Sequence, residues 1–213
     1  MRRGWSAVVV ETYAELARRI RAAPARLGAV RLVAVDGPSG AGKTLFTARL
    51  ADALQGPREQ RADDVTVLHT DDLLDGWADQ FTFWRRLDEQ ALEPLRAGRP
   101  GGYHRYSWLR ERFTTPRVPV PAHGVLLIEG VSAARAAIRP ELTLAVFVTA
   151  PDPLRLDRTL ARDGERLRPH LLRWRAAEAG HFAADGTAEA ADLLVDGAPT
   201  GLVDPGRHYQ RLR

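Results

Sequence analysis

The sequence predicts an α/β fold in which a mostly parallel β-sheet carries helices on both faces. Short apolar runs of strand length alternate with longer segments of helical period, which is the pattern of repeated β-α units. The strand-like runs are mostly apolar, as expected of strands that are buried on both faces. Polar clusters follow three of these runs directly, at 37–44, 71–72 and 129, and the ends of parallel strands gather at one edge of a sheet.

The predicted elements follow in order along the 213 residues. Residues 11–23 predict an amphipathic helix, because Thr12 and Glu15 form a capping-box pattern at its start. Strands are predicted at 30–35, 65–69, 125–128, 142–148 and 191–195. Further helices are predicted at 43–54, 80–97, 154–162 and 169–182.

Two segments predict little regular structure. Residues 98–122 contain a Gly-Gly pair and several prolines, and a loop of this length in a compact domain usually serves a function. The tail from Gly197 onward is also rich in glycine and proline, and we expect it to be loose until Tyr209.

Length and composition bound the class of protein. With 45% hydrophobic and 27% charged residues, we expect one domain (1–213) with an N-terminal helix (1–29), a core (30–197) and a lid at about 155–170. The absence of cysteine excludes disulfides and cysteine-ligated zinc, and it fits a cytoplasmic protein. The apolar run at 7–10 is too short for a signal-peptide core, and no stretch approaches the roughly 20 apolar residues of a membrane span. No membrane association is therefore expected.

The chain is basic, with a formal net charge of +4 and a pI of about 10.1. Its basic residues are scattered rather than grouped in a block, and no nucleic-acid-binding signature is present. The charge therefore indicates attraction for anionic ligands such as nucleotides, and no nucleic-acid partner is expected. The sequence leaves the oligomeric state open, with a homo-oligomer among the alternatives.

Residues 37–44 read Gly-Pro-Ser-Gly-Ala-Gly-Lys-Thr and fit the phosphate-loop pattern G-x-x-x-x-G-K-[ST] at every specified position. The segment follows a predicted strand and opens a predicted helix, so backbone N–H groups and the positive end of the helix would point at an anion. Lys43 is the only lysine in the chain, and a compact ammonium suits the space between the β- and γ-phosphates better than a guanidinium. The sequence therefore predicts binding of a nucleoside triphosphate.

Each residue of this loop has an expected role. The glycines allow a backbone geometry and a close approach that a side chain would block. Lys43 would neutralise phosphate charge, and Thr44 would offer its hydroxyl to Mg²⁺. The nucleotide-binding residues are expected to be Gly37, Ser39, Gly40, Ala41, Gly42, Lys43 and Thr44. The alternative is a glycine-rich turn that resembles the pattern by chance.

Carboxylates follow two other predicted strands. Asp71 and Asp72 could supply a base that accepts a proton from an attacking hydroxyl, and Asp71 is favoured because it lies nearer the strand end. The alternative is a helix N-cap pair. Glu129 ends an apolar run, where phosphate-loop proteins place a metal-coordinating acid, and the alternative for it is a solvated acid at a turn.

Arginines crowd the segment from 155 to 168, at Arg155, Arg158, Arg162, Arg166 and Arg168. A solvated charged helix is the ordinary interpretation of such a run. The sharper alternative is a mobile lid that supplies Arg158 and Arg162 to the phosphoryl group in transfer. The sequence leaves both interpretations open.

Aromatic and basic residues alternate in the segment 103–110, where Tyr106 and Trp108 could stack on a planar substrate. Arg135 is a further candidate for substrate binding. The alternative is that the aromatic rings hold a long loop against the core. The other aromatic residues before it, Trp77, Phe81, Phe83 and Trp84, are expected in the core or in a groove wall. The six histidines have no metal-ligand spacing, so no zinc site is predicted.

Through these residues and motifs, the chain resembles the uridine kinase family of phosphate-loop kinases, in the group with pantothenate kinase and phosphoribulokinase. The resemblance covers about residues 30–197. It rests on the segments 36–44, Thr70 to Trp77, Pro94 to Pro100, Tyr106-Ser107-Trp108, Leu127 to Gly130 and Arg158 to Asp163. The sequence differs from the family pattern in having Ser107 after the tyrosine, where the family has aspartate, and Leu73-Leu74 in place of an aromatic pair.

The resemblance implies a phosphate-loop NTPase fold with a five-stranded parallel sheet. It also implies transfer of the γ-phosphoryl group of ATP to a small-molecule hydroxyl, with Asp71 as base, Glu129 near the metal and Arg162 in a lid. We therefore expect a kinase that uses ATP and Mg²⁺ and acts on a small-molecule acceptor, a nucleoside such as uridine or cytidine. Two alternatives stay open: a kinase for a non-nucleoside acceptor, and a nucleotide-binding switch or accessory protein without an acceptor.

Overall fold

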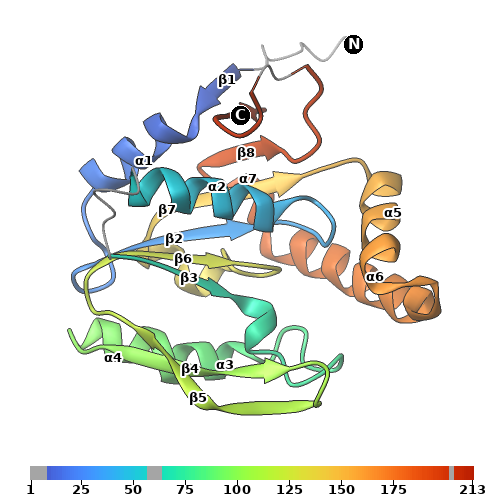
Figure 1. Ribbon diagram of the computed structural model, residues 1–213, viewed down its shortest axis with the longest axis horizontal. Coiled ribbons are helices and arrows are strands. Elements are labelled where there is room, and N and C mark those ends of the chain that lie inside the picture. Colours follow the sequence, from blue (N-terminus) through green and yellow to red (C-terminus); the bar gives the residue numbers. More distant parts are fainter. Residues whose placement is uncertain (1–8, 57–63, 202–203) are drawn as a thin grey trace.

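Seven strands form the main sheet of the computed structural model, which describes residues 9–56, 64–201 and 204–213 (Figure 1). Its order is β1-β9-β8-β7-β2-β6-β3. Five neighbouring strands run parallel: β8 (Leu193–Asp196), β7 (Leu142–Thr149), β2 (Val30–Asp36), β6 (Gly124–Glu129) and β3 (Val65–His69). These are the five strands that the sequence predicts.

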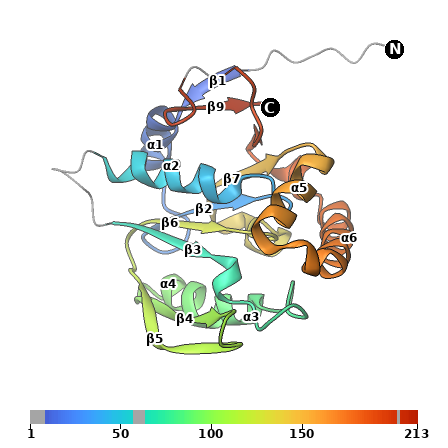
Figure 2. The same cartoon turned by 45° about the vertical axis from the view of Figure 1, so that its right-hand side comes forward.

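The expectation of a five-stranded sheet is nevertheless wrong, because two further strands extend it. β1 (Val9–Thr12) and β9 (His208–Arg211) pair antiparallel with each other, and β9 also pairs antiparallel with β8 (Figure 2). The tail thus contains a regular strand from His208 to Arg211. Both strands are only four residues long and lie at opposite ends of the chain, so no local sequence pattern predicts their pairing. Residues 1–8, which include part of the run at 7–10, lie outside the described residues.

Helices cover both faces of the sheet, as predicted. One face packs against α1 (Tyr13–Ala22) and α2 (Lys43–Gln55), and the core there includes Val33 and Val35 of β2. The other face carries Leu32 and Ala34, and it packs against the helical turns of 84–96 and residues of α6. The alternation within one strand follows from the pleat, since successive side chains point to opposite faces. The remaining helices are α5 (Asp152–Asp163), α6 (Arg168–Asp185) and α7 (Thr187–Ala190).

The start of α1 has the predicted capping box. Thr12 Oγ1 accepts a hydrogen bond from the Glu15 backbone N–H at 3.1 Å, and the Glu15 carboxylate accepts one from the Thr12 backbone N–H at 3.4 Å. This satisfies two N–H groups that a helix start otherwise leaves without partners.

The helix predicted at 80–97 is present as consecutive helical turns from 84 to 96. They are α3 (Trp84–Leu87), a π-helical segment (Asp88–Leu92) and α4 (Glu93–Arg96). The π segment directly precedes Glu93 and Pro94, and Pro94 has no N–H to donate to the helix ladder.

The prediction of an irregular loop at 98–122 is wrong. The segment forms an antiparallel hairpin of β4 (Gly101–Ser107) and β5 (Arg112–Val120), separate from the main sheet. β5 contains Pro116 and Pro119, which a strand tolerates only where one edge needs no donors. The hairpin packs on the core through Tyr103, whose side chain is fully buried.

Short 3₁₀ turns lie directly after β3 (Thr70–Asp72), directly before β7 (Ala136–Glu141) and between α5 and α6 (Glu165–Leu167). The phosphate loop, the first of these turns and α5 all lie at the carboxyl ends of parallel strands (Figure 1). None of the described helices combines the length and the apolar content that crossing a lipid bilayer requires.

Candidate phosphate and acceptor site

The loop between β2 and α2 has the backbone that its glycines permit. Gly37, Gly40 and Gly42 have φ values of 136°, 77° and 101°, which side chains rarely adopt. Space is also short: a Cβ on Gly37 would lie 2.1 Å from the Val148 carbonyl oxygen, and one on Gly40 would lie 2.4 Å from that of Arg155. The first N–H groups of α2 have no helical acceptor and face the loop, which makes the site suited to an anion.

Lys43 and Thr44 begin α2 directly beneath this loop. The largely buried Lys43 donates from Nζ to the Pro38 carbonyl at 3.2 Å, and Thr44 Oγ1 donates to Glu129 Oε1 at 3.0 Å. Glu129 ends β6, and the parallel register aligns it with Val35 of β2 on one side and His69 of β3 on the other. The sheet therefore brings the loop and the acid together, although 85 residues separate Thr44 from Glu129.

His69 is part of this site and was not predicted. Its Nδ1 lies 2.7 Å from Glu129 Oε1, and this contact raises the pKa of His69. Burial acts to raise the pKa of Glu129, but the His69 hydrogen bond and the Lys43 charge outweigh it and hold that pKa below its usual range. The sequence signal that could have identified His69 is its position, because it is the last residue of the strand that leads into Thr70 and Asp71.

The two aspartates after β3 face different partners. Burial raises the pKa of the Asp71 carboxyl, while the nearby charges of Lys43 and Arg162 act to lower it and Glu129 acts to raise it. By its accessible surface Asp71 is exposed, so the burial that raises its pKa comes from protein atoms packed around the carboxyl while water still reaches it. Asp72 instead accepts from the Tyr103 hydroxyl at 3.3 Å and pairs with Arg105 Nε at 3.0 Å, both on the hairpin.

The two arginines predicted for the lid lie in different surroundings. Arg162 is at the end of α5, where it pairs with Asp163 at 2.7 Å, and the charges of Asp71 and Glu129 help to raise its pKa. Arg158 donates from Nη1 to the carbonyl oxygens of Gly40 and Gly197, both at 3.1 Å. Arg162 is therefore placed toward the carboxylates, whereas Arg158 braces the backbone of the phosphate loop.

Aromatic rings lie next to Asp71 on the hairpin side. Trp108 donates from Nε1 to the Asp71 carbonyl at 3.3 Å, and its ring packs edge-on against Tyr106 and Trp77 at centroid distances of 5.3 and 5.4 Å. Trp77 in turn packs against Trp174 of α6 at 5.5 Å. A cavity of about 390 Å³ opens beside Trp77, and its lining is Trp77, Ala78, Gln80, His170, Arg173, Trp174 and Ala177.

Arg135 and the aromatic residues near it form a separate group. Its guanidinium lies 4.6 Å from the ring centre of Trp84, and its Nη2 donates to the Phe81 carbonyl at 3.4 Å. Burial lowers the pKa of Arg135. Phe83 is buried in the core, in agreement with the prediction. The role of Arg135 in substrate binding stays a prediction.

Asp36, the residue before the phosphate loop, is a second participant that was not predicted as a site residue. It is fully buried and accepts backbone N–H bonds from Gly37 at 2.7 Å, Ser132 at 2.9 Å and Ala134 at 2.8 Å. Burial raises its pKa to about 6. Asp36 thus ties the start of the loop to the segment that follows Glu129.

The oxygen ligands present fit Mg²⁺. Within the described ranges no group of three or more His, Cys, Asp or Glu is arranged around a common point. Mg²⁺ is usually held by one or two protein oxygens together with substrate phosphates and water, so such a group is not required. The Thr44 hydroxyl and the Glu129 carboxylate are adjacent, and both are hard oxygen ligands.

Comparison with known proteins supports the fold. No family model matches the sequence, and no curated protein matches it either. Among solved structures, a possible uridine kinase from Bacillus stearothermophilus has 20% identity and a TM-score of 0.59, with 85% of this chain and 96% of that chain covered. A candidate fructose transport system kinase from Silicibacter sp. TM1040 has 21% identity and a TM-score of 0.55, with 85% and 95% covered.

A third structure, the YGR205w protein, has 9% identity and a TM-score of 0.50, with 85% of this chain and 89% of that chain covered. At these identities the comparisons establish the fold alone. The chain has the fold of uridine kinase-like and related phosphate-loop kinases, and the resemblance seen in the sequence motifs is confirmed at that level.

Proposed function

We propose that this protein is a kinase that transfers the γ-phosphoryl group of ATP to a hydroxyl of a small molecule, with Mg²⁺ as cofactor. The observation that carries the proposal is the convergence of Lys43, Thr44, Glu129 and Asp71, which come from three strand ends, on the phosphate loop. Phosphoryl transfer needs little beyond positioning and charge neutralisation, and these groups offer both.

Each residue has a role in this mechanism. The amides of the loop and Lys43 would bind the phosphates, and Arg162, whose charge acts on Asp71 and Glu129, would add a second positive charge. Asp71, whose pKa burial raises, would accept the proton of the attacking hydroxyl, since a carboxylate of raised pKa is a stronger base. Thr44 and Glu129 would hold Mg²⁺, which neutralises phosphate charge when bound, while His69 fixes the position of Glu129.

The acceptor would lie between Asp71 and the aromatic rings. Trp108 contacts the Asp71 backbone, and Trp77 links Trp108 to the cavity beside α6. Aromatic walls suit a planar ring, which supports a nucleoside such as uridine or cytidine as the acceptor. Tyr106 would contribute to the same wall. A cytoplasmic location stays a prediction.

A non-nucleoside acceptor is the second candidate. Ser107 stands where the nucleoside kinases have a carboxylate, and the second structural neighbour is a candidate kinase of a fructose transport system. A nucleotide-binding switch without an acceptor is the remaining alternative, and turnover measurements separate it from both.

The direct test is ADP formation from ATP and Mg²⁺ with a panel of nucleosides, sugars and other alcohols. A kinase predicts that one class of acceptor raises ADP formation well above the basal rate, with one phosphoryl group in the product for each ADP. If no acceptor does so while ATP still binds, the switch hypothesis replaces the kinase. Inhibition of turnover by uridine and cytidine, but not by sugars, would select the nucleoside class.

A further inference from the structure

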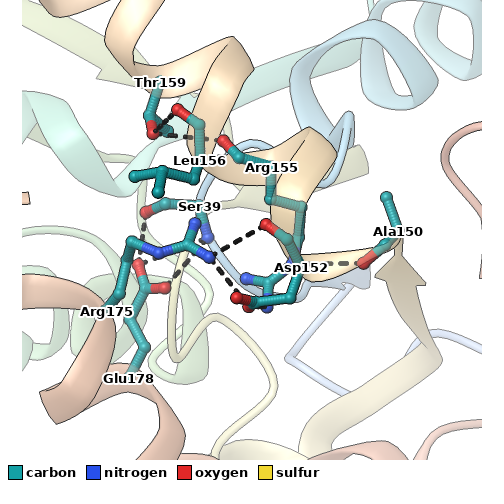
Figure 3. A network of polar contacts seen from close by, with 8 residues as sticks. All are labelled: Ser39, Ala150, Asp152, Arg155, Leu156, Thr159, Arg175 and Glu178. Carbon is teal, nitrogen blue, oxygen red and sulfur yellow. Dashed lines mark hydrogen bonds and ion pairs between the residues drawn. The ribbon is translucent and has the colours of Figure 1, made fainter. Parts of the chain in front are cut away.

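A carboxylate from α6 occupies part of the phosphate loop. Glu178, which lies within α6 and is 1% exposed, accepts the Ser39 backbone N–H at 3.1 Å through Oε2 and at 3.3 Å through Oε1. Glu178 Oε1 also accepts the Ser39 hydroxyl (Figure 3). The negative charge of Glu178 is thus buried against a loop whose backbone N–H groups would also bind a phosphate. Burial of a charge costs free energy unless the charge is paired.

A guanidinium one turn earlier on the same helix is incompletely paired. Arg175, whose side chain is 10% exposed, donates from Nη2 to the Asp152 carbonyl at 3.2 Å and to Asp152 Oδ1 at 2.8 Å. Its Nη1 is buried and has no hydrogen-bond partner within the described part of the chain. Figure 3 shows Arg175 and Glu178 projecting from one helix toward Ser39 and α5.

Residues three positions apart on a helix share a face, and their side chains can pair. Glu178 contacts Ser39, and the spacing makes the unpaired Nη1 of Arg175 its candidate second partner. In the arrangement seen, the hydrogen bonds of Ser39 are satisfied and those of Arg175 are not. In the alternative arrangement, Nη1 of Arg175 would gain the Glu178 carboxylate as a partner and Ser39 would lose it.

An incoming polyphosphate would alter this balance. The Arg155 backbone packs closely on Gly40, and Arg158 donates to the Gly40 carbonyl, so α5 leaves no room for a side chain at this position of the loop. Phosphate bound at the loop would then lie near the Glu178 carboxylate and repel it. A ligand shifts a two-state equilibrium when it interacts differently with the two states, and this repulsion differs between them.

We propose that Glu178 is a positioning residue that holds the phosphate loop in its nucleotide-free arrangement, and that a bound triphosphate moves the carboxylate from Ser39 to Arg175. The inference rests on the proposed nucleotide binding and adds a built-in contact that opposes it. α6 also lines the acceptor-side cavity with Arg173 and Trp174, so the same helix touches both halves of the site.

The test compares wild type with Glu178→Gln by calorimetric titration with ATP and Mg²⁺, and with inorganic tripolyphosphate. The glutamine still has an oxygen that accepts from Ser39, so the fold is retained while the negative charge is removed. Both ligands are expected to bind Glu178→Gln roughly tenfold more tightly than wild type. Glu93→Gln, an exposed substitution of the same kind on α4, is the matched control and leaves both dissociation constants unchanged.

Equal or weaker binding by Glu178→Gln overturns the proposal while leaving nucleotide binding intact. If wild type binds neither ATP nor tripolyphosphate, the proposed function is wrong, and this inference falls with it.

A measurement on wild type keeps the test independent of any variant. Tripolyphosphate is expected to accelerate amide hydrogen exchange in the part of α6 around Glu178, because that helix loses its contact with Ser39. Exchange in α1, which packs on the opposite face of the sheet from α6, serves as the reference. Unchanged or slower exchange around Glu178 in the presence of bound tripolyphosphate contradicts the proposal.

Discussion

The phosphate half and the acceptor half of the site are built in different ways. The phosphate half consists of backbone groups and largely buried charged side chains, with Asp36, Lys43 and Glu129 each held by specific contacts. The acceptor half consists of rings that contact one another and remain partly open to solvent, such as Trp77 and Trp108. The phosphate half consists of groups that binding of any polyphosphate requires. In the acceptor half, the side chains that form the walls could be replaced without disturbing the sheet.

This difference determines how strongly each half of the site restricts its residues. Buried charges tolerate few alternatives, because each must be paired. Exposed aromatic rings contact one another, and ligands of many shapes could take the place of such ring contacts. We therefore expect substitutions in the phosphate half to affect turnover or stability, and substitutions in the acceptor half to affect the acceptor KM.

The largest expected effect is that of Asp71→Asn. Loss of the base should lower turnover by about 10²- to 10⁴-fold, while the dissociation constant of ATP changes little. Because burial raises the pKa of Asp71, the acid limb of the wild-type pH–rate profile should lie above the ordinary carboxyl range, with activity rising as Asp71 ionises. That limb should be absent from the residual activity of the variant.

Asp72→Asn is the matched control for this experiment. It removes contacts with Tyr103 and Arg105 of the hairpin, so it should act mainly on the acceptor half. Equal losses of turnover in the two variants would contradict the assignment of Asp71 as the base.

Arg162→Met should lower turnover by about 10²-fold, because it removes a positive charge that faces Asp71 and Glu129. Arg166→Met removes an exposed arginine from the same segment and should leave turnover nearly unchanged. Single-turnover rates of phosphoryl transfer measure both. If the two variants lose activity equally, the arginines act only through the charge of the segment as a whole.

Asp36→Asn should act on stability rather than on turnover. Its amide offers one acceptor oxygen where the carboxylate accepts three backbone N–H groups, and an unpaired buried donor costs about 1–3 kcal/mol. The folded-state pKa of about 6 lies above the usual 3.8, so the folded protein binds this proton more tightly than the unfolded chain does. The stability that this proton contributes is present in full below pH 3.8 and is lost as the pH rises through 6.

Urea unfolding at several pH values between 4 and 8 measures this prediction. The stability difference between wild type and Asp36→Asn should shrink toward high pH by about 3 kcal/mol, since the pKa values differ by about two units. Asp157→Asn, an exposed substitution of the same kind on α5, should show no comparable trend. A constant difference for Asp36→Asn would mean that this carboxyl has the same pKa in both states.

The smallest expected effect is that of Trp77→Ala in the acceptor half. Loss of one wall of the cavity should raise the acceptor KM about tenfold and leave the KM of ATP unchanged, since ring contacts contribute about 0.5–1.5 kcal/mol each. Leu172→Ala, an exposed apolar substitution on α6, is the control. A rise in the KM of ATP instead would mean that the two halves are coupled, and α6, which carries both Glu178 and Trp174, would be the element that couples them.

The sequence alone determined the phosphate loop and the parallel part of the sheet. The loop at 37–44 is a local motif, and its conformation follows from glycines that lie within six residues of one another. The five parallel strands were predictable because strands buried on both faces are continuous apolar runs. Their carboxyl ends meet at one edge of the sheet, which is why Glu129 and Asp71 could be expected near the loop.

Only the tertiary structure decided the rest. The pairing of β1 with β9 and the contact of Glu178 with Ser39 join segments far apart in the chain, and no local periodicity records such pairings. The hairpin at 101–120 is local, but its glycines and prolines are also typical of a loop. His69 and Asp36 gained their roles from neighbours supplied by other strands and loops. Local sequence specifies backbone conformation and burial, whereas the partner of a buried polar group depends on which distant residues the fold brings beside it.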